Sequence, residues 1–209
     1  EYICIDWDSD GMQDIEIGIY LGRGTYGVVH KGTLHGQDVA VKLIAEHASR
    51  SERDVAAKLL RNEVKTLSRC RHKNIVQLIG ACSDPPMLVM AFASRGTLRD
   101  LLMHSKTNLL PSEKIRFIKE ICDGMTMLHA KNILHLDLKP ENILISGYST
   151  PWVADFGLSL AISATMTAGG ASTKGERGTM QYKAPELSCP KKMGGAKYEK
   201  PADVYSFGM

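Results

Sequence analysis

Apolar and polar positions alternate with a period of two over much of the first 93 residues. The alternation runs through five segments between glycine-bearing turns, which read IEIGIYLG, YGVVHKG, DVAVKLI, NIVQLIG and MLVMAF from Ile15 onward. A period of two places neighbouring side chains on opposite faces of a strand. The pattern therefore predicts antiparallel strands.

One helical segment interrupts these strands. Ser51 and Asp54 have the spacing of a capping box, and the following VAAKLLRNEVKTLSRC has helical periodicity. The expected apolar stripe of this helix comprises Val55, Leu59, Leu60, Val64 and Leu67.

Helical periodicity dominates after Gly96. Thr97 and Asp100 are spaced to cap a short helix, and Ser112 opens a longer one, EKIRFIKEICDGMTMLHA. The expected inner face of the longer helix comprises Ile115, Ile118, Ile121, Cys122, Met125 and Leu128. The sequence thus predicts an α+β fold, in which a small antiparallel-sheet lobe with one helix precedes a mostly helical lobe.

Composition and charge disfavour several classes of protein. The chain has 209 residues, of which 44% are apolar, and its net charge of +3 comes without a dense Lys/Arg tract, so nucleic acid is not an expected partner. Its five cysteines lack CxxC or metal-type spacing, which favours free thiols in a reducing compartment. No apolar run reaches the roughly 18 residues of a membrane span, and the first residues do not resemble a signal peptide. We expect a cytoplasmic protein without a membrane span.

A glycine-rich hairpin is the first candidate site. Gly22, Gly24 and Gly27 form a G-x-G-x-x-G pattern, and a strand-like segment follows it instead of the helix that a dinucleotide site requires. Because glycines carry no side chain, this backbone could lie directly against the phosphates of a nucleotide. A hairpin without a binding role is the alternative, and the motif alone does not decide between them.

Lys42 is the second candidate. The alternation in VAVK places it on the same face as Ala40, and a lysine that points inward needs an anionic partner. Nucleotide phosphates and Glu63 of the predicted helix are two candidates, and both contacts can coexist if the helix packs on the strand. The alternative is a surface lysine whose charged end reaches solvent.

Two further segments place charged residues inside apolar runs. They are ILHLDLKPENIL at residues 133–144 and VADFG at residues 153–157. Asn142 and Asp155 carry oxygen ligands of the kind that Mg²⁺ prefers, with substrate phosphates and water completing the shell. Asp137 is then available to accept the proton of an attacking hydroxyl. A hydrogen-bonded polar turn is a reasonable alternative for either segment alone, but is hard to sustain for both in this order.

These motifs occur in the order typical of protein kinases, and the chain resembles that family from about residue 15 to its last residue. The match comprises G-x-G-x-x-G-x-V from Gly22, V-A-V-K ending at Lys42, H-x-D-L-x-x-x-N from His135, D-F-G from Asp155 and A-P-E from Ala184. The resemblance implies a bilobal protein-kinase-like fold. Its expected parts are an N-terminal extension (1–14), a small ATP-binding lobe with the hinge (15–93) and an incomplete large lobe (94–209).

The resemblance also implies ATP and Mg²⁺ as cofactors and a role for each matched residue. Asp137 is the implied catalytic base, Lys42 and Glu63 form the pair that holds the ATP phosphates, and Asn142 and Asp155 bind Mg²⁺. The implied nucleotide contacts are Leu21, Gly22, Gly24, Gly27, Val29, Ala40, Lys42, Met90, Ala93, Leu144 and Asp155, with residues 91–93 as the hinge. The stacked apolar spine of an active kinase is matched by Leu67, Leu78, Phe156 and His135, with Asp203 as its anchor.

The expected substrate class rests on fewer residues. Lys139 in DLKPEN and Thr179 in GTMQYKAPE are similar to those of Ser/Thr kinases, in which the lysine meets the γ-phosphate and the threonine bonds both the lysine and the base. Together with DVYSFGM, these segments look most like the tyrosine-kinase-like Ser/Thr group, which implies a protein substrate phosphorylated on Ser or Thr. The alternatives are a dual-specificity or tyrosine kinase, a nucleotide-binding scaffold and an inactive truncated fragment.

The chain departs from the family pattern at two places. Leu136 replaces the usual arginine that pairs with a phosphorylated activation loop, so activity is expected not to depend on a phosphate at this position. The residues of that loop available for modification are Thr165, Thr167, Ser172 and Thr173. The chain also ends at Met209, where the family continues, so the 209-residue chain by itself is expected to be marginally folded and prone to aggregate.

Overall fold

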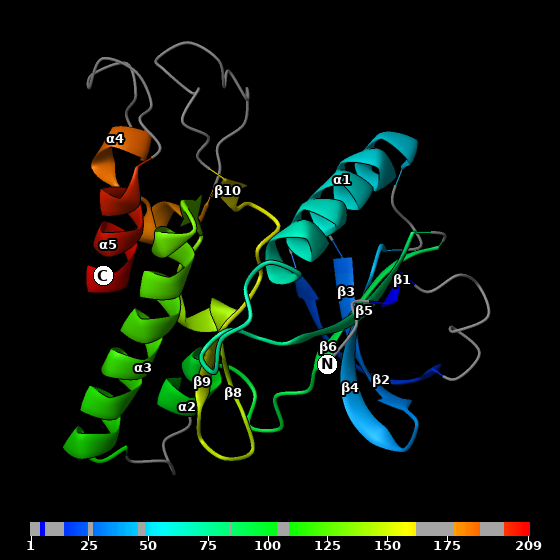
Figure 1. Cartoon of the computed structure of the whole chain (residues 1–209), viewed down its shortest axis with the longest axis horizontal. Coiled ribbons are helices and arrows are strands. Elements are labelled where there is room, and N and C mark those ends of the chain that lie inside the picture. Colours follow the sequence, from blue (N-terminus) through cyan, green and yellow to red (C-terminus); the bar gives the residue numbers. More distant parts are fainter. Residues whose placement is uncertain are drawn as a thin grey trace.

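The chain forms a sheet-rich lobe and a mostly helical lobe, which confirms the expected α+β, bilobal arrangement (Figure 1). The computed structural model describes residues 5–6, 15–24, 27–45, 49–83, 85–103, 109–161, 178–188 and 199–209. None of the helices in these ranges is long and apolar enough to cross a lipid bilayer.

The first lobe is built on a six-stranded sheet with the order β1-β5-β6-β4-β3-β2. Its strands are β1 (Ile5–Asp6), β2 (Ile15–Gly24), β3 (Gly27–Leu34), β4 (Gln37–Leu43), β5 (Leu78–Ser83) and β6 (Pro86–Ala91). The five expected strands pair with one another in antiparallel fashion, as predicted. β1 pairs in parallel with β5, so part of the expected N-terminal extension joins the sheet.

The fourth expected strand starts later than predicted, at Leu78. The backbone before it pairs with Val153 of the other lobe instead: Val153 N donates to Asn74 O at 2.9 Å, and Val76 N donates to Val153 O at 3.0 Å. Residues 74–76 therefore belong to the junction between the lobes, although their apolar pattern is that of a strand.

Helix α1 (Arg50–Leu67) packs against the sheet (Figure 1). The predicted capping pair is wrong by two residues, because Ser49 and Glu52 form the capping box and the longer glutamate side chain reaches back to Ser49 N at 2.8 Å. The predicted stripe is wrong at Val55, whose side chain is 51% exposed. The buried residues of α1 are Ala56, Leu60, Glu63, Thr66 and Leu67, so its inner face carries two polar side chains that an apolar pattern does not reveal.

The second lobe contains helices and short hairpins. Its elements are α2 (Leu98–Met103), α3 (Pro111–Ala130), β7 (Ile133–Leu134), the 3₁₀ turn η2 (Pro140–Asn142), β8 (Ile143–Ile145), β9 (Pro151–Val153), β10 (Leu160–Ala161), the 3₁₀ turn η3 (Met180–Tyr182), α4 (Pro185–Ser188) and α5 (Lys200–Gly208). Thr97 and Asp100 cap α2 as predicted, with Asp100 N donating to Thr97 Oγ1 at 3.0 Å.

The predicted inner face of α3 is only partly correct. Ile115 and Ile118 are 54% and 51% exposed, and Cys122 is also exposed. The buried residues are Phe117, Ile121, Gly124, Met125 and Leu128. Gly124 explains why a different face of α3 is buried. A Cβ there would lie 2.7 Å from Asn74 O, and only glycine allows the helix to approach so closely.

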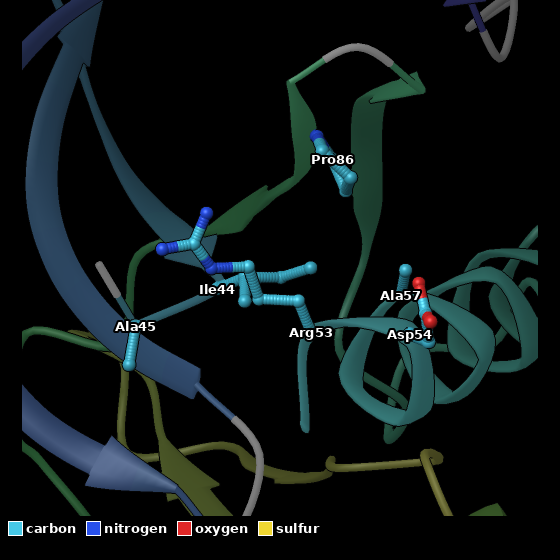
Figure 2. Close-up of a pocket in the computed structure, with 6 residues that line it drawn as sticks. All are labelled: Ile44, Ala45, Arg53, Asp54, Ala57 and Pro86. Atoms are coloured by element: carbon cyan, nitrogen blue, oxygen red, sulfur yellow. The ribbon is translucent and has the colours of Figure 1, made fainter. Parts of the chain in front are cut away.

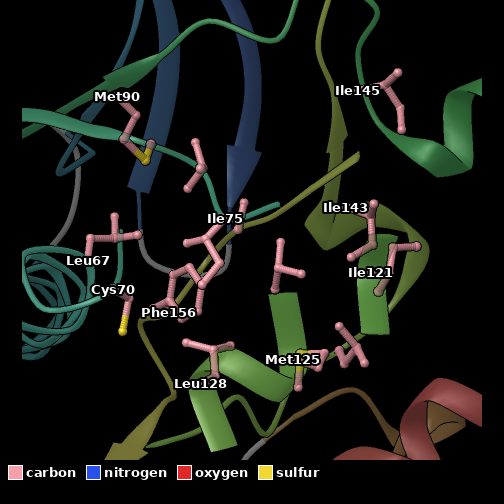
Figure 3. Close-up of a cluster of buried hydrophobic side chains, with 14 of the residues drawn as sticks. Leu67, Cys70, Ile75, Met90, Ile121, Met125, Leu128, Ile143, Ile145 and Phe156 are labelled. Atoms are coloured by element: carbon pink, nitrogen blue, oxygen red, sulfur yellow. The ribbon is translucent and has the colours of Figure 1, made fainter. Parts of the chain in front are cut away.

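The main hydrophobic cluster joins the two lobes. It contains Leu67 of α1, Met90 of β6 and Leu128 of α3, with the fully buried Phe156 among them (Figure 3). A second cluster on the other face of the sheet includes Val39, Val41 and Val89. The sheet therefore presents its opposite face, which carries Ala40 and Lys42, toward the helical lobe.

Candidate active site

Lys42 of β4 joins Glu63 of α1 and Asp155 in one ion network. Lys42 Nζ lies 2.7 Å from Glu63 Oε2 and 2.8 Å from Asp155 Oδ1. Burial lowers the pKa of Lys42, but the two carboxylates together raise it above its usual value. An ammonium group has three N–H donors, so two carboxylates leave one donor for a phosphate oxygen.

The pKa values of the two carboxylates in this network shift in opposite directions. Burial raises the pKa of Glu63 above its usual range, against the attraction of Lys42. Burial also acts to raise the pKa of Asp155, but the charge of Lys42 and its hydrogen bond outweigh this and hold that pKa below the usual range. Asp155 therefore carries a full negative charge at neutral pH, as a cation ligand must.

Asp137 lies in the turn between β7 and η2 and is held by four hydrogen bonds. Thr179 N and Thr179 Oγ1 donate to its Oδ1 at 2.9 and 2.8 Å, and Lys139 Nζ donates to its Oδ2 at 2.8 Å. Asn142 Nδ2 donates to Oδ2 at 3.1 Å. Lys139 also donates to Thr179 Oγ1 at 2.7 Å, so Thr179 contacts both the lysine and Asp137.

The backbone before Asp137 is fixed by Asp203 of α5. His135 N and Leu136 N donate to the two oxygens of Asp203 at 2.9 and 2.8 Å, and His129 Nε2 donates to it at 2.8 Å. His135 accepts from Asp137 N at Nδ1, so its proton is on Nε2, which donates to Ala154 O at 2.9 Å. The turn is therefore tied to α5 on one side and to the segment before Asp155 on the other.

The remaining spine positions also meet. The His135 and Phe156 ring centroids are 5.1 Å apart, Phe156 and Leu67 share the main cluster, and Leu78 packs against it. Leu136 is 7% exposed and has a φ of 66°, so it is buried in a left-handed backbone conformation that is unfavourable for leucine. Its carbonyl faces Gly178, where a Cβ would lie 2.5 Å from Leu136 O.

The expected nucleotide contacts in the first lobe lie on one face of the sheet. Val29 pairs with Lys42, and Ala40 with Met90, and directly opposite residues of antiparallel strands point to the same side. Gly22 pairs with Val29 and Gly24 with Gly27. Thr25 and Tyr26, at the tip of the glycine-rich hairpin, lie outside the described residues.

The other expected contacts come from the edges of this face. Leu21 of β2 is 43% exposed, Ala93 follows β6 in the hinge, and Leu144 of β8 pairs with Thr97 through an isolated bridge. Ala93 O accepts from Gly96 N at 3.2 Å, which fixes the turn after the hinge. Both lobes thus contribute to the expected binding surface.

Asn142 and Asp155 fit the chemistry of a Mg²⁺ site. Asn142 Nδ2 donates to Asp137 O at 2.8 Å, so the amide is oriented with Oδ1 as its cation-binding end. Asp155 uses Oδ1 for Lys42 and has Oδ2 as its second candidate ligand. Within the described ranges, no group of three or more His, Cys, Asp or Glu residues could hold a metal ion. Mg²⁺ does not require one, because one or two protein oxygens together with substrate phosphates and water suffice.

A cavity of about 480 Å³ lies away from these residues, between the end of β4, the first turns of α1 and the start of β6 (Figure 2). Its lining residues are Ile44, Ala45, Arg53, Asp54, Ala57 and Pro86. The cavity beside Lys42, Glu63 and Asp155 is only about 10 Å³, so these side chains pack together without room for a ligand between them. A phosphate must therefore approach Lys42 from outside the ion network.

Three polar residues beside the ion network, Asn62, Thr66 and Ser159, were not predicted from the sequence. Asn62 and Thr66 of α1 hydrogen-bond to the segment after Asp155, at Ser159. The available signal was weak: polar residues recur near the inner stripe of a helix, next to a glutamate already assigned a role.

The sequence of the chain matches known proteins along most of its length. The family described as protein tyrosine and serine/threonine kinase matches residues 15–209. Serine/threonine-protein kinase CTR1 of Arabidopsis thaliana is 36% identical over 97% of this chain, and STY46 of the same organism is 35% identical over 97%. Dual specificity protein kinase pyk3 of Dictyostelium discoideum is 33% identical over 95% of this chain.

These relatives are much longer than the chain. The matched region covers 24% of CTR1, 33% of STY46 and 14% of pyk3. The similarity therefore concerns only part of each relative.

Proposed function

Because this chain belongs to the family of protein tyrosine and serine/threonine kinases, we propose that it transfers the γ-phosphoryl group of ATP to Ser or Thr hydroxyls of protein substrates. The observation that carries the proposal is the hydrogen-bonded set of Asp137, Lys139, Asn142 and Thr179, which is joined to the segment of the charged Lys42–Asp155 pair by the hydrogen bond from Ala154 N to Asn142 O at 2.9 Å. Such a set supplies the positioning and charge neutralisation on which phosphoryl transfer depends.

Asp137 is the proposed general base. Its carboxylate has about four lone-pair sites, and four donors already occupy them. A substrate hydroxyl must therefore displace one donor. Lys139 has the longest and most flexible side chain of these donors, so we assign it this movement: it turns toward the γ-phosphate, and Asp137 Oδ2 then accepts the hydroxyl hydrogen bond.

ATP and Mg²⁺ are the cofactors that this family generally uses. In this chain, Lys42 would hold the α- and β-phosphates with Glu63 fixing its position, and Asn142 and Asp155 would bind Mg²⁺. The bound ion would neutralise charge on the phosphates. The adenine would lie against Val29, Ala40 and Leu144, beside Met90 and the hinge residue Ala93. Leu21 and the three glycines of the hairpin would cover the rest of the nucleotide.

The choice of Ser/Thr over Tyr rests on Lys139 and Thr179. Their mutual hydrogen bond of 2.7 Å and their shared contact with Asp137 form a compact group at the base. Dual specificity is the second candidate, which the similarity to pyk3 favours.

The proposal includes 15–93 as the ATP-binding lobe and 94–209 as part of the second lobe. A cytoplasmic location also belongs to it, supported by Cys70 and Cys122, which form no disulfide bond within the described residues.

Replacement of Asp155 by alanine tests the proposal in the full-length protein. We expect Mg²⁺-dependent transfer from ATP to a generic basic protein to fall at least ~100-fold, because the variant loses a Mg²⁺ ligand and a partner of Lys42. The phosphorylated residues of the wild-type product should be Ser and Thr. The matched control is Asp123→Ala, whose side chain is 57% exposed on α3. Activity of Asp155→Ala equal to that of the control would contradict kinase activity, and phosphotyrosine as the main product would contradict the substrate class.

Leu136 supports a second prediction, on regulation. Its buried, apolar side chain cannot pair with a phosphate, so alanine at Thr165, Thr167, Ser172 and Thr173 together should leave kcat within about threefold of wild type. These four positions lie outside the described residues. The measurement compares the initial rate of substrate phosphorylation by the variant with that of wild type before and after phosphatase treatment. A loss of activity through disorder of that loop would contradict the prediction.

A further inference from the structure

Helix α1 is joined to the segment after Asp155 by three neutral side chains, Asn62, Thr66 and Ser159, which we call the polar latch. Asn62 Nδ2 donates to Ser159 O at 2.9 Å and lies 3.2 and 3.3 Å from Gly157 O and Phe156 O. Backbone carbonyls can only accept, so the amide must present its NH₂ end to all three. Two N–H donors thus serve a cluster of carbonyl oxygens that converge on one side chain.

The direction of the other hydrogen bonds in the polar latch follows from the same reasoning. Ser159 Oγ donates to Phe156 O at 2.7 Å. Its proton is therefore committed, and Thr66 Oγ1, 2.9 Å away, must donate to Ser159 Oγ. Thr66 and Ser159 are 7% and 5% exposed, so water does not compete effectively for these groups. This series of hydrogen bonds, from Thr66 through Ser159 to Phe156 O, fixes the turn that follows Asp155.

The polar latch lies next to the ion network in sequence and in space. Glu63 follows Asn62, accepts from Phe156 N at 3.3 Å and binds Lys42 through its other oxygen. Burial opposes the charge of Glu63, and a buried ion pair contributes little net stability after desolvation. Neutral hydrogen bonds to backbone carbonyls do not carry that penalty, so they are better suited to hold α1 in place.

We propose that Asn62 is a positioning residue, which holds α1 against residues 156–159 so that Glu63 stays within reach of Lys42, and Lys42 within reach of Asp155. The inference rests on the proposed kinase function. It states which residue keeps the Lys42–Glu63–Asp155 ion network of that function assembled. Asn62 contacts neither nucleotide nor substrate in this role and acts only through Glu63 and the segment after Asp155.

Two substitutions at this position separate hydrogen-bond donation from space filling. Asn62→Asp keeps the shape of the side chain but places carboxylate oxygens against three carbonyl oxygens, whereas Asn62→Ala removes the contacts without repulsion. We expect kcat/KM for ATP to fall ~10-fold in Asn62→Ala and ~100-fold in Asn62→Asp, one and two tenfold steps of transition-state free energy. The matched control is Lys65→Ala, an exposed change on the same helix that should stay within twofold of wild type.

The pH profile gives a readout that a packing role would not change. A protonated carboxyl can donate one hydrogen bond, and the carbonyl oxygens raise the pKa of the introduced carboxyl. The activity of Asn62→Asp relative to wild type should therefore rise as the pH falls from 8 to 6. Thr66→Val should reduce kcat/KM less than Asn62→Ala, because it removes one hydrogen bond.

Hydrogen–deuterium exchange of the full-length protein tests the inference without relying on activity. Amides of α1 and of residues 155–161 should exchange at least ~10-fold faster in Asn62→Asp than in wild type and Lys65→Ala, because the polar latch no longer closes. The inference is overturned if Asn62→Ala is more impaired than Asn62→Asp, or if exchange in α1 is unchanged in Asn62→Asp. If the wild-type protein transfers no phosphate, the proposed function fails, and the exchange result alone decides whether Asn62 holds α1.

Discussion

Asp137→Asn is expected to lower kcat for substrate phosphorylation by about 10³-fold, the largest effect of any single change at this site. Asparagine has nearly the same shape but cannot accept the proton of the attacking hydroxyl. It also presents an NH₂ group to donors that now converge on a carboxylate, among them Thr179 N at 2.9 Å and Lys139 Nζ at 2.8 Å. Both the base and its orientation are lost together.

Nucleotide binding should survive this change, because Lys42, Glu63 and Asp155 are untouched. The measurement is kcat at saturating ATP and substrate, with the thermal shift on adding Mg²⁺-ATP as the record of binding. Asp123→Asn, on the exposed surface of α3, is the control. If Asp137→Asn retains a kcat within fivefold of wild type, Asp137 is not the base. If Asp137→Asn loses both its activity and the thermal shift, the variant is misfolded at the site, and the more conservative Asp137→Glu takes its place in the comparison.

Asp203→Asn is expected to lower the free energy of unfolding by about 3 kcal/mol at pH 7, from the hydrogen bonds to a charged group that it weakens. Asp203 is 1% exposed and accepts from His135 N, Leu136 N and His129 Nε2. An asparagine retains one accepting oxygen and places its NH₂ group against at least one of these donors. The melting temperature should fall by about 10 °C, measured by calorimetry. Asp38→Asn, which breaks a surface ion pair with Lys31, should change it by less than about 2 °C.

The effect should also depend on pH with a defined sign. Burial acts to raise the pKa of Asp203, but the hydrogen bonds that it accepts from His129, Leu136 and His135 hold that pKa below the usual range. A depressed pKa means that the ionised form stabilises the fold at every pH above the unfolded value of about 3.9, and that this stability is lost as the pH falls through the lowered pKa. The difference between wild type and Asp203→Asn should therefore be constant from pH 8 to 5 and shrink in more acidic solution. A difference that grows on acidification would contradict the role assigned to this carboxylate.

Sequence patterns predicted the elements whose signal is local. Alternation found the five antiparallel strands because side chains on a strand must face opposite sides, and Thr97 with Asp100 marked the start of α2 because a cap involves only residues three apart. The face of α3 was predicted less well, since it depends on the close approach of Gly124 to Asn74 O, a contact between distant parts of the chain.

The candidate site divides in the same way. The strand alternation placed Lys42 on an inward face and left Glu63 as one of its candidate partners, and the structure brings the two side chains to 2.7 Å. The polar latch was not predicted, because Asn62 and Ser159 are 97 residues apart and Asn62 bonds mainly to backbone carbonyls, which carry no sequence signal. The parallel pairing of β1 with β5 was missed for a similar reason: two residues are too few to show a period.

The backbone bonds between residues 74–76 and Val153 determine how the two lobes can move. Because Val76 N and Asn74 O are both paired with Val153 at 3.0 and 2.9 Å, the segment that follows α1 is attached to the helical lobe although it leads into the sheet. If the lobes separate while these two hydrogen bonds stay intact, the backbone must bend at Gln77 and at the hinge. Helix α1 would consequently rotate about its C-terminal end, and its first turns, near Ser49, would move farthest.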